Sequence, residues 1–327
     1  MTFPATNLNF PALGCGTWAW GNQLLWHYQP QMDEELQQVF NYCVSQGITL
    51  FDTGDSYGTG RFKGRSEWLL GRFASQYRGP HQEQICLATK LAPYPWRLTP
   101  QSIFRAGEAS AQRLGRPIDL VQLHWSTANY APAQERALLQ GLVRLQQEGV
   151  AKAIGLSNFG PQRLQWAHAY LGDRGVKIAS LQVQYSLLCP EPVTSSPLRA
   201  WCHQWGIRLI AYSPLALGLL TGKYAPGGPY PQGLRGILAR QLLPHMPPLL
   251  ATLTAIAKKH QKTLAQVALN WCLQKGTLPI PGARTLAQAQ ENYGAWGWSL
   301  EAGEIAELDQ VAARLPRKMM QNIFQSR

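Results

Sequence analysis

Charged residues and long apolar runs are both scarce in this sequence. Only 15% of the 327 residues are charged, against 45% that are hydrophobic, which argues against a disordered chain and suits a large buried core. No stretch reaches the roughly 20 consecutive apolar residues that a transmembrane helix needs. The N-terminal residues have neither the basic nor the apolar region of a secretory signal. We therefore expect a globular protein with no membrane association and a cytoplasmic location.

Motifs for metal binding and for dithiol chemistry are missing as well. The six cysteines include no C-x-x-C pair, and most of them have apolar neighbours, as buried thiols do. The seven histidines show no H-x-x-x-H spacing, and the adjacent Cys202 and His203 would not converge on one metal ion from a helix. The sequence thus predicts structural thiols and no metal site.

Acidic residues are few, at 18 against 30 lysines and arginines, which gives a net charge of +12. This charge permits a nucleic acid, an acidic lipid or a polyanionic cofactor as a partner. The basic residues are spread singly, however, and no basic stripe alternates with aromatic residues as in a nucleic-acid groove. The densest group, Lys258 to Lys262, is typical of a solvated helix end. We expect no nucleic-acid partner, and the sequence leaves the oligomeric state open.

Short apolar runs alternate with longer amphipathic segments along the whole chain, as in repeated βαβ units. The predicted strands recur at intervals of about 30 residues, the length of one βα unit, with one longer interval before the last strand. They lie at Ala12 to Cys15 and begin near Ile48, Ile85, Asp119, Ala151, Ile178, Arg208 and Thr277. Eight such units predict an α/β protein with one domain over residues 1–327, a single (β/α)8 TIM barrel with its site at the C-terminal face of the strands.

Three helix starts are recognisable from capping residues. Thr99 precedes Pro100, and the stretch from Asn158 to Pro161 likewise puts a capping residue before a helix-starting proline. Thr263 precedes an apolar helical run whose tryptophan, Trp271, is expected in the core.

One segment, Pro226 to Gly233, is strongly broken by proline and glycine and lies in the long interval after the seventh strand. In a barrel this loop is on the ligand-binding face, where a long irregular loop is often a lid. A tolerated surface insertion is the alternative, since loop length alone is weak evidence.

Four polar side chains lie at or just after the ends of three successive predicted strands. Asp52 ends one strand and Tyr57 follows it in the next loop, while Lys90 and His124 end the two strands that come after. Because strand ends of a barrel form one face, an acid, a phenol, an ammonium and an imidazole converge there. Gly14 to Ala19 also matches the G-x-G-x-x-A dinucleotide fingerprint, but no apolar helix follows it, so we regard that match as accidental.

This group is suited to proton transfer. A tyrosine has a pKa near 10, and an adjacent ammonium that stabilises its phenolate makes it a usable proton donor and acceptor. Lys90 would do this for Tyr57, and Asp52 would hold Lys90. His124 can hydrogen-bond a substrate carbonyl and fix its orientation.

With these residues the chain resembles the aldo-keto reductase superfamily, whose tetrad of Asp, Tyr, Lys and His matches Asp52, Tyr57, Lys90 and His124. The resemblance covers essentially the whole chain and includes the segments Gly14 to Trp18, Ile154 to Phe159, Ile280 to Arg284 and Glu291-Asn292. It implies reduction of an aldehyde or ketone to the alcohol, with hydride from NADP(H) and a proton from Tyr57, and it requires no metal.

The resemblance also implies how the cofactor is held. Ser157, Asn158 and Gln182 would hold the nicotinamide carboxamide, and Tyr212 would stack on the ring. Arg284 suits the 2′-phosphate of NADP because a guanidinium binds phosphate in a fork geometry. The full implied set is Gly16, Thr17, Trp18, Asp52, Ser157, Asn158, Gln182, Tyr212, Ser213, Pro214, Leu215, Gly218, Gly282, Ala283, Arg284, Gln288 and Asn292.

Two positions depart from the usual pattern of the superfamily. Gln184 stands where relatives often have glutamate in an Asn-Gln-x-Glu segment. Many members have lysine at the phosphate-binding turn, whereas Arg284 is the only cation between Lys275 and Arg314. NADP preference is therefore expected to depend on this one arginine.

The substrate mouth is expected to be aromatic. Trp18, Trp125 and Trp20 would line it together with Tyr57 and His124, which suits hydrophobic aldehydes or ring carbonyls. For Trp18 and Trp20, packing between barrel and helices is an equal alternative. A pyridoxal, a sugar aldehyde and a lipid-derived aldehyde all remain open as substrates.

A second class of function is also open. The chain could be an NADP-binding regulatory subunit with little turnover, resembling the potassium-channel β-subunits. The intact tetrad favours an enzyme.

Overall fold

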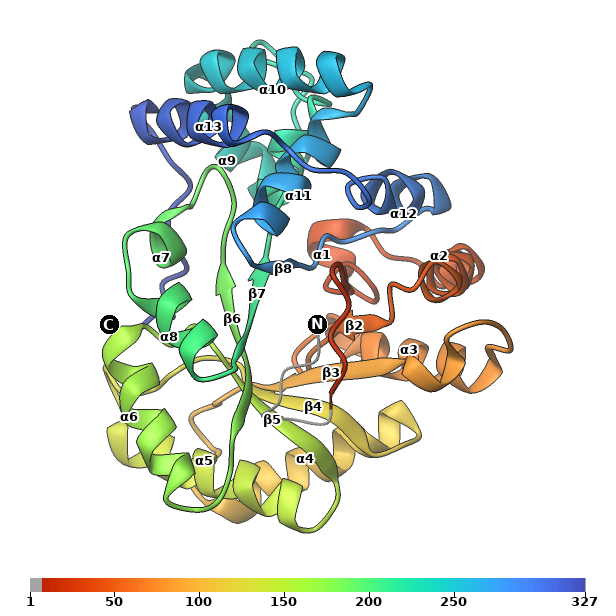
Figure 1. Cartoon of the computed structure of the whole chain (residues 1–327). Coiled ribbons are helices and arrows are strands. Elements are labelled where there is room, and N and C mark those ends of the chain that lie inside the picture. The colour runs from red at the N-terminus through yellow and green to blue at the C-terminus, as the bar shows by residue number, and fades with distance from the viewer. Residues whose placement is uncertain (1–7, 327) are drawn as a thin grey trace.

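The computed structural model, which describes residues 8–326, contains one sheet of eight parallel strands in the order β1 to β8 (Figure 1). The strands are β1 (Cys15–Gly16), β2 (Leu50–Asp52), β3 (Cys86–Leu91), β4 (Ile118–Leu123), β5 (Ala151–Ser157), β6 (Ile178–Gln184), β7 (Arg208–Tyr212) and β8 (Leu278–Pro279). All but β1 start within two residues of the predicted starts. The first strand is shorter and later than predicted, because only Cys15 and Gly16 pair with β2.

The sheet closes on itself through β8 and β1. The amides of Gly14 and Gly16 donate to the carbonyl oxygens of Pro279 and Pro281, each at 3.0 Å. A Cβ on Gly16 would lie 2.8 Å from the carbonyl oxygen of Ile280, so only glycine permits this approach. The closed sheet confirms the predicted (β/α)8 barrel.

Helices follow every strand and lie outside the sheet, as Figure 1 shows. The α-helices are α1 (Gln23–Trp26), α2 (Asp33–Ser45), α3 (Arg65–Gln76), α4 (Pro100–Leu114), α5 (Pro132–Gln147), α6 (Pro161–Gly172), α7 (Glu191–Thr194), α8 (Leu198–Gln204), α9 (Leu234–Leu242), α10 (Pro247–His260), α11 (Leu264–Gln274), α12 (Leu286–Tyr293) and α13 (Ala302–Arg314). Short 3-10 helices lie at η1 (Pro30–Met32), η2 (Gly60–Phe62), η3 (Gln82–Gln84), η4 (Ala216–Thr221) and η5 (Leu243–His245).

Two apolar layers hold this arrangement. Small and medium side chains from strands β2 to β8 fill the barrel interior, which Phe10 joins from the N-terminal segment. A larger layer lies between the strands and the helices and includes Trp271, as predicted. Both faces of each strand are therefore buried, which explains why the strands read as continuous apolar runs.

The helix starts follow the predicted signals in two cases of three. Thr99 caps α4 and Thr263 caps α11, each by accepting a bond from a backbone amide. The start of α6 was predicted correctly at Pro161, but its capping residue is Gly160, with no side-chain cap. Asn158 does not cap this helix, because its amide turns into the barrel mouth and donates to the carbonyl oxygen of His124.

No helix within residues 8–326 is both long and apolar enough to span a bilayer. The cytoplasmic location stays a prediction.

Candidate active site

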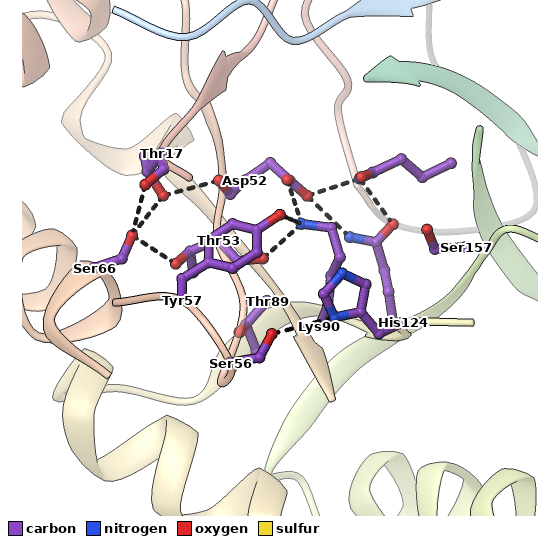
Figure 2. Close-up of polar contacts among 12 residues, drawn as sticks. Thr17, Asp52, Thr53, Ser56, Tyr57, Ser66, Thr89, Lys90, His124 and Ser157 are labelled. Atoms are coloured by element: carbon purple, nitrogen blue, oxygen red, sulfur yellow. Dashed lines mark hydrogen bonds and ion pairs between the residues drawn. The ribbon is translucent and has the colours of Figure 1, made fainter. Parts of the chain in front are cut away.

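A cavity of about 640 Å³ opens at the C-terminal ends of the strands. Asp52, Tyr57, Lys90 and His124 all line it, so the barrel brings together the four side chains that the sequence singled out. Figure 2 shows the Lys90 amine between the Asp52 carboxylate and the Tyr57 hydroxyl.

Lys90 organises the centre of the site. Its Nζ donates to Asp52 Oδ2, to the carbonyl oxygen of Thr53 at 2.7 Å and to Tyr57 Oη at 3.0 Å. An ammonium has three N–H bonds, and these three acceptors use all of them. Tyr57 Oη therefore accepts from Lys90 and keeps its own proton free for a partner in the cavity.

The buried Asp52 carboxylate is satisfied on both of its oxygens. Oδ2 pairs with Lys90, while Oδ1 accepts from Gln182 Nε2 at 2.7 Å and from Gln122 Nε2 at 3.2 Å. A buried charge is tolerated when it is paired and fully hydrogen-bonded in this way. Gln122, on β4, was not singled out in the sequence because a lone glutamine in an apolar strand carries no motif.

Burial and charge set the protonation states here. Burial raises the pKa of Tyr57 and outweighs the lowering effect of Lys90. Burial alone would lower the pKa of Lys90, yet the neighbouring Asp52 and Tyr57 raise it overall. Burial and the charge of Lys90 hold the pKa of His124 well below its usual 6.5. At neutral pH the site thus holds a protonated phenol, an ammonium and a neutral imidazole. Lys90 stabilises the phenolate as expected, but burial disfavours the phenolate more strongly.

The His124 ring lies near the rings of Tyr57 and Trp125. Its ring centroid lies 6.0 Å from that of Tyr57 and 5.1 Å from that of Trp125. Its Nδ1 is 3.4 Å from the hydroxyl oxygen of Ser56, a long contact that Figure 2 shows, and His124 lines the cavity.

Amide and hydroxyl groups line the cavity next to the four side chains that the sequence singled out. Ser157, Asn158 and Gln182 line it beside the half-buried ring of Tyr212. Tyr212 Oη donates to Asn158 Oδ1 at 2.9 Å, and Asn158 Nδ2 donates to the carbonyl oxygen of His124 at 3.0 Å. Asn158 adopts a left-handed backbone with φ of 60°, which asparagine tolerates better than most residues.

Another part of the cavity is cationic. The guanidinium carbons of Arg235 and Arg284 lie 4.1 Å and 5.4 Å from the ring centroid of Trp26. Burial lowers the pKa of Arg284, and the charge of Arg235 lowers it further. Among residues 8–326, Trp26 Nε1 and Arg235 Nε are buried without a hydrogen-bond partner. Two neighbouring arginines, together with the unsatisfied N–H groups of Arg235 and Trp26, suit an anionic ligand.

Arg235 corrects the expectation that Arg284 stands alone. Arg235 lies in α9, part of the long interval after β7, so it is close to Arg284 in space and distant in sequence. Lys223 lines the same cavity.

Comparison with known proteins identifies the lineage of this barrel. The sequence model described as "Aldo/keto reductase family" matches residues 12–313. The chain belongs to the aldo/keto reductase family. Together with relatives that are named as reductases, this membership supports an NADP-dependent carbonyl oxidoreductase, as the resemblance implied.

Individual relatives cover nearly the whole chain. It is 50% identical over 323 residues to a protein named pyridoxal reductase, chloroplastic, from Arabidopsis thaliana, an alignment with 98% of this chain and 88% of the relative. It is 32% identical to an uncharacterised oxidoreductase of Mycobacterium tuberculosis, with 89% of this chain and 85% of the relative aligned.

Solved structures agree on the fold. A thermostable aldo-keto reductase in complex with the inhibitor epalrestat matches with a TM-score of 0.75 and 26% identity, with 95% of this chain and 98% of that one covered. A glycerol dehydrogenase from Gluconobacter oxydans matches with a TM-score of 0.80 and 24% identity, with 100% of this chain and 98% of that one covered.

The cavity of this aldo/keto reductase has groups that fit NADP(H). The amides of Asn158 and Gln182 match a carboxamide, and the ring of Tyr212 offers an aromatic face. Unsatisfied N–H groups on Arg235 and Trp26 match a phosphate. The fit thus rests on chemistry at two separate parts of the cavity.

Most of the implied cofactor residues line the cavity of this reductase, and two do not. Thr17 is buried and donates from its hydroxyl to the carbonyl oxygen of Asp52 at 2.9 Å, so it supports the site from behind. Ala283 is also buried, and its carbonyl oxygen accepts from Trp20 Nε1 at 2.9 Å. The members that do line it are Gly16, Trp18, Asp52, Ser157, Asn158, Gln182, Tyr212, Ser213, Pro214, Leu215, Gly218, Gly282, Arg284, Gln288 and Asn292.

Of the three tryptophans considered for the substrate mouth, two line the cavity and one packs in the core. Trp18 and Trp125 line the cavity, and Trp18 remains 38% exposed. Trp20 is fully buried against the barrel wall, so the expectation that it lines the mouth is wrong.

The cavity lining includes residues on both sides of the predicted lid and residues of the C-terminal tail. The segment Pro226 to Gly233 does not line the cavity, although Tyr224 and Arg235 on its two sides do; a role as a lid stays a prediction. The C-terminal tail, residues 316–326, contributes Met319, Asn322 and Phe324.

One cluster of possible metal ligands lies apart from this lining. His260, Glu301 and Glu304 group together within the described residues. Lys259 donates to both carboxylates, at 2.8 Å and 2.9 Å, which makes the group an ion-pair cluster.

Proposed function

We propose that this protein reduces pyridoxal, or a closely similar aromatic aldehyde, to the alcohol with NADPH. The Lys90 to Tyr57 hydrogen bond at 3.0 Å, facing the cavity, is the observation on which the proposed chemistry depends. The choice of substrate is supported by the 50% identity with a pyridoxal reductase.

The cofactor would supply a hydride to the carbonyl carbon. Ser157, Asn158 and Gln182 would hold its carboxamide end, with the Tyr212 ring against the nicotinamide. The backbone of the loop from Ser213 to Gly218 would contact the pyrophosphate. Arg284, Gln288 and Asn292, with Arg235, would hold the adenosine end.

Tyr57 would donate the proton to the carbonyl oxygen. Its hydroxyl accepts from Lys90, so the phenolic proton is directed toward another acceptor. Negative charge that develops on Tyr57 Oη as it loses this proton would be stabilised by Lys90. A neutral His124 would hydrogen-bond the same carbonyl oxygen and hold it near Tyr57.

The cavity has an aromatic wall formed by Trp18, Trp125 and Phe324, which suits a planar ring. Trp125 stacks on Phe324 with ring centroids 4.3 Å apart, and Trp18 lines the cavity as well. Flat apolar surfaces of this kind favour an aromatic aldehyde over a sugar aldehyde or a flexible lipid aldehyde.

Steady-state NADPH oxidation with matched aldehydes tests this proposal. We expect kcat/KM for pyridoxal to exceed the values for a simple sugar aldehyde and an alkyl aldehyde. Equal or lower kcat/KM for pyridoxal would contradict the proposed substrate. NADPH binding without turnover on any aldehyde would favour the regulatory subunit instead.

The activity should show no titration step near the usual pKa of histidine. Because the pKa of His124 is lowered, its imidazole gains a proton only well below pH 6.5. Because the pKa of Tyr57 is raised, its phenol keeps its proton into the alkaline range. We expect kcat/KM with a non-ionisable aromatic aldehyde to stay flat between about pH 6 and 9. A fall centred near pH 6.5 would mean that His124 titrates normally.

Discrimination between NADPH and NADH should depend on both arginines. We expect Arg284→Ala and Arg235→Ala each to weaken NADPH binding about ten- to a hundred-fold, because a charge-assisted contact contributes about 1.5 to 3 kcal/mol. NADH affinity should change little. Fluorescence titration of both cofactors measures this, and Arg240→Ala, an exposed change on the same helix α9, is the matched control. Equal weakening for both cofactors would contradict the phosphate assignment.

A further inference from the structure

The C-terminal tail, residues 316–326, follows α13 and crosses the ends of three neighbouring strands. Met319 N donates to the carbonyl oxygen of Leu188 at 2.9 Å, in the loop after β6. Gln184 Nε2, at the end of β6, donates to the carbonyl oxygen of Met320 at 3.3 Å. Ser326 N donates at 3.0 Å to the carbonyl oxygen of Asn158, just after β5. The tail is thus bonded to the rim of the cavity along its length.

Asn322 joins this tail to the end of β7. Its Nδ2 donates to Tyr212 Oη at 2.8 Å, while its Oδ1 accepts from the backbone amide of Phe324 at 3.0 Å. The bond to Phe324 fixes which end of the amide faces Tyr212, because only an oxygen can accept it. Tyr212 Oη therefore accepts a hydrogen bond from the tail.

The bonds then continue in one direction across the site. Tyr212 Oη gives its own proton to Asn158 Oδ1 at 2.9 Å, and Asn158 Nδ2 donates to the carbonyl oxygen of His124 at 3.0 Å. Each amide and hydroxyl is oriented by the one before it. Asn322 thus stands at the start of a chain that ends at the residue proposed to hold the carbonyl.

We propose that Asn322 is a positioning residue that fixes the Tyr212 ring and the Asn158 amide for the nicotinamide. The inference rests on the proposed cofactor orientation. Asn322 acts through Tyr212 Oη, and the tail carries it to the cavity rim.

Gln184 accounts for how the tail docks. An amide at this position donates to the Met320 carbonyl, whereas a carboxylate would place an oxygen against another oxygen. Glutamine at position 184, where relatives often have glutamate, therefore suits a tail whose backbone carbonyl lies at the end of β6. Phe324, stacked on Trp125, anchors the same tail on the aromatic wall.

A double-mutant cycle on the full-length protein tests the proposal, with NADPH affinity measured by fluorescence titration without substrate. We expect Asn322→Leu and Tyr212→Phe each to raise the Kd for NADPH about five-fold, the effect of losing one hydrogen bond. The combined variant should be no weaker than Tyr212→Phe alone, because both changes interrupt the same chain. Thermal unfolding without cofactor checks that each variant is folded.

The control is Ile323→Ala, which changes a neighbouring tail side chain that is 80% exposed and outside the cavity lining. Its Kd should match that of the wild type. Additive effects in the double variant, or an unchanged Kd in Asn322→Leu, would overturn the role of Asn322. If the wild type itself bound no NADPH, the proposed function would fail first, so the two failures are distinguishable.

Discussion

Replacing Tyr57 by phenylalanine should lower the rate of carbonyl reduction by about 10² to 10⁴, the usual effect of losing a positioned acid. The substitution removes the hydroxyl that accepts from Lys90 and leaves the ring in place. NADPH affinity should stay within a few-fold of the wild type, since the substitution removes a proton donor and not a proposed cofactor contact. Steady-state turnover and cofactor titration on one preparation measure both quantities.

Tyr170→Phe is the matched control for this change. The Tyr170 hydroxyl is buried without a hydrogen-bond partner in the described part of the chain, and the residue lies in α6. Its loss should leave turnover unchanged. If Tyr57→Phe kept more than about a tenth of wild-type turnover, Tyr57 would not be the acid.

Lys90→Met should lower turnover by a similar factor and should also destabilise the fold. Lys90 is the cationic partner of the buried Asp52 carboxylate. Breaking a buried pair by removing one charge costs about 3 to 5 kcal/mol of unfolding free energy. Bonds from Gln122 and Gln182 remain on the carboxylate, so we expect the lower end of that range. Denaturant unfolding and turnover should be measured together.

A paired variant separates the two effects of Lys90. Asp52→Asn with Lys90→Met removes both charges and should recover most of the lost stability while turnover stays low. Lys152→Met is the surface control, because the 57% exposed Lys152 pairs with Asp119 at the starts of β5 and β4, away from the cavity, and should matter little. Recovery of turnover in the paired variant would mean that Lys90 serves only to neutralise Asp52.

The barrel and the centre of the site could be predicted because their signals are local. Each buried strand reads as an apolar run, and Asp52, Lys90 and His124 lie at or next to the ends of such runs. The barrel then brings consecutive strand ends together without any further information.

The remaining parts of the site depend on long-range packing. Arg235 reaches Trp26 and Arg284 from a helix inside the long interval, and no local pattern links these three residues. Trp20 and Trp18 stand two positions apart, yet one is buried behind the wall and the other lines the cavity. Which face a tryptophan takes is decided by tertiary contacts.

The direction in which the pKa of Tyr57 shifts could not be predicted from the sequence either. The proximity of Lys90 was predicted correctly, but the depth of the site was not known. Burial proves to have the larger effect, and it keeps the phenol protonated. This state suits a proton donor for reduction.

A single-turnover reaction with pyridoxal and NADPH that carries deuterium at the transferable position tests the central claim most directly. The account predicts that the wild type oxidises the cofactor and forms the alcohol with one deuterium on the former aldehyde carbon. Tyr57→Phe should form it far more slowly at equal cofactor occupancy. An alcohol without deuterium, or pyridoxal left unreduced by an enzyme saturated with NADPH, would contradict the account.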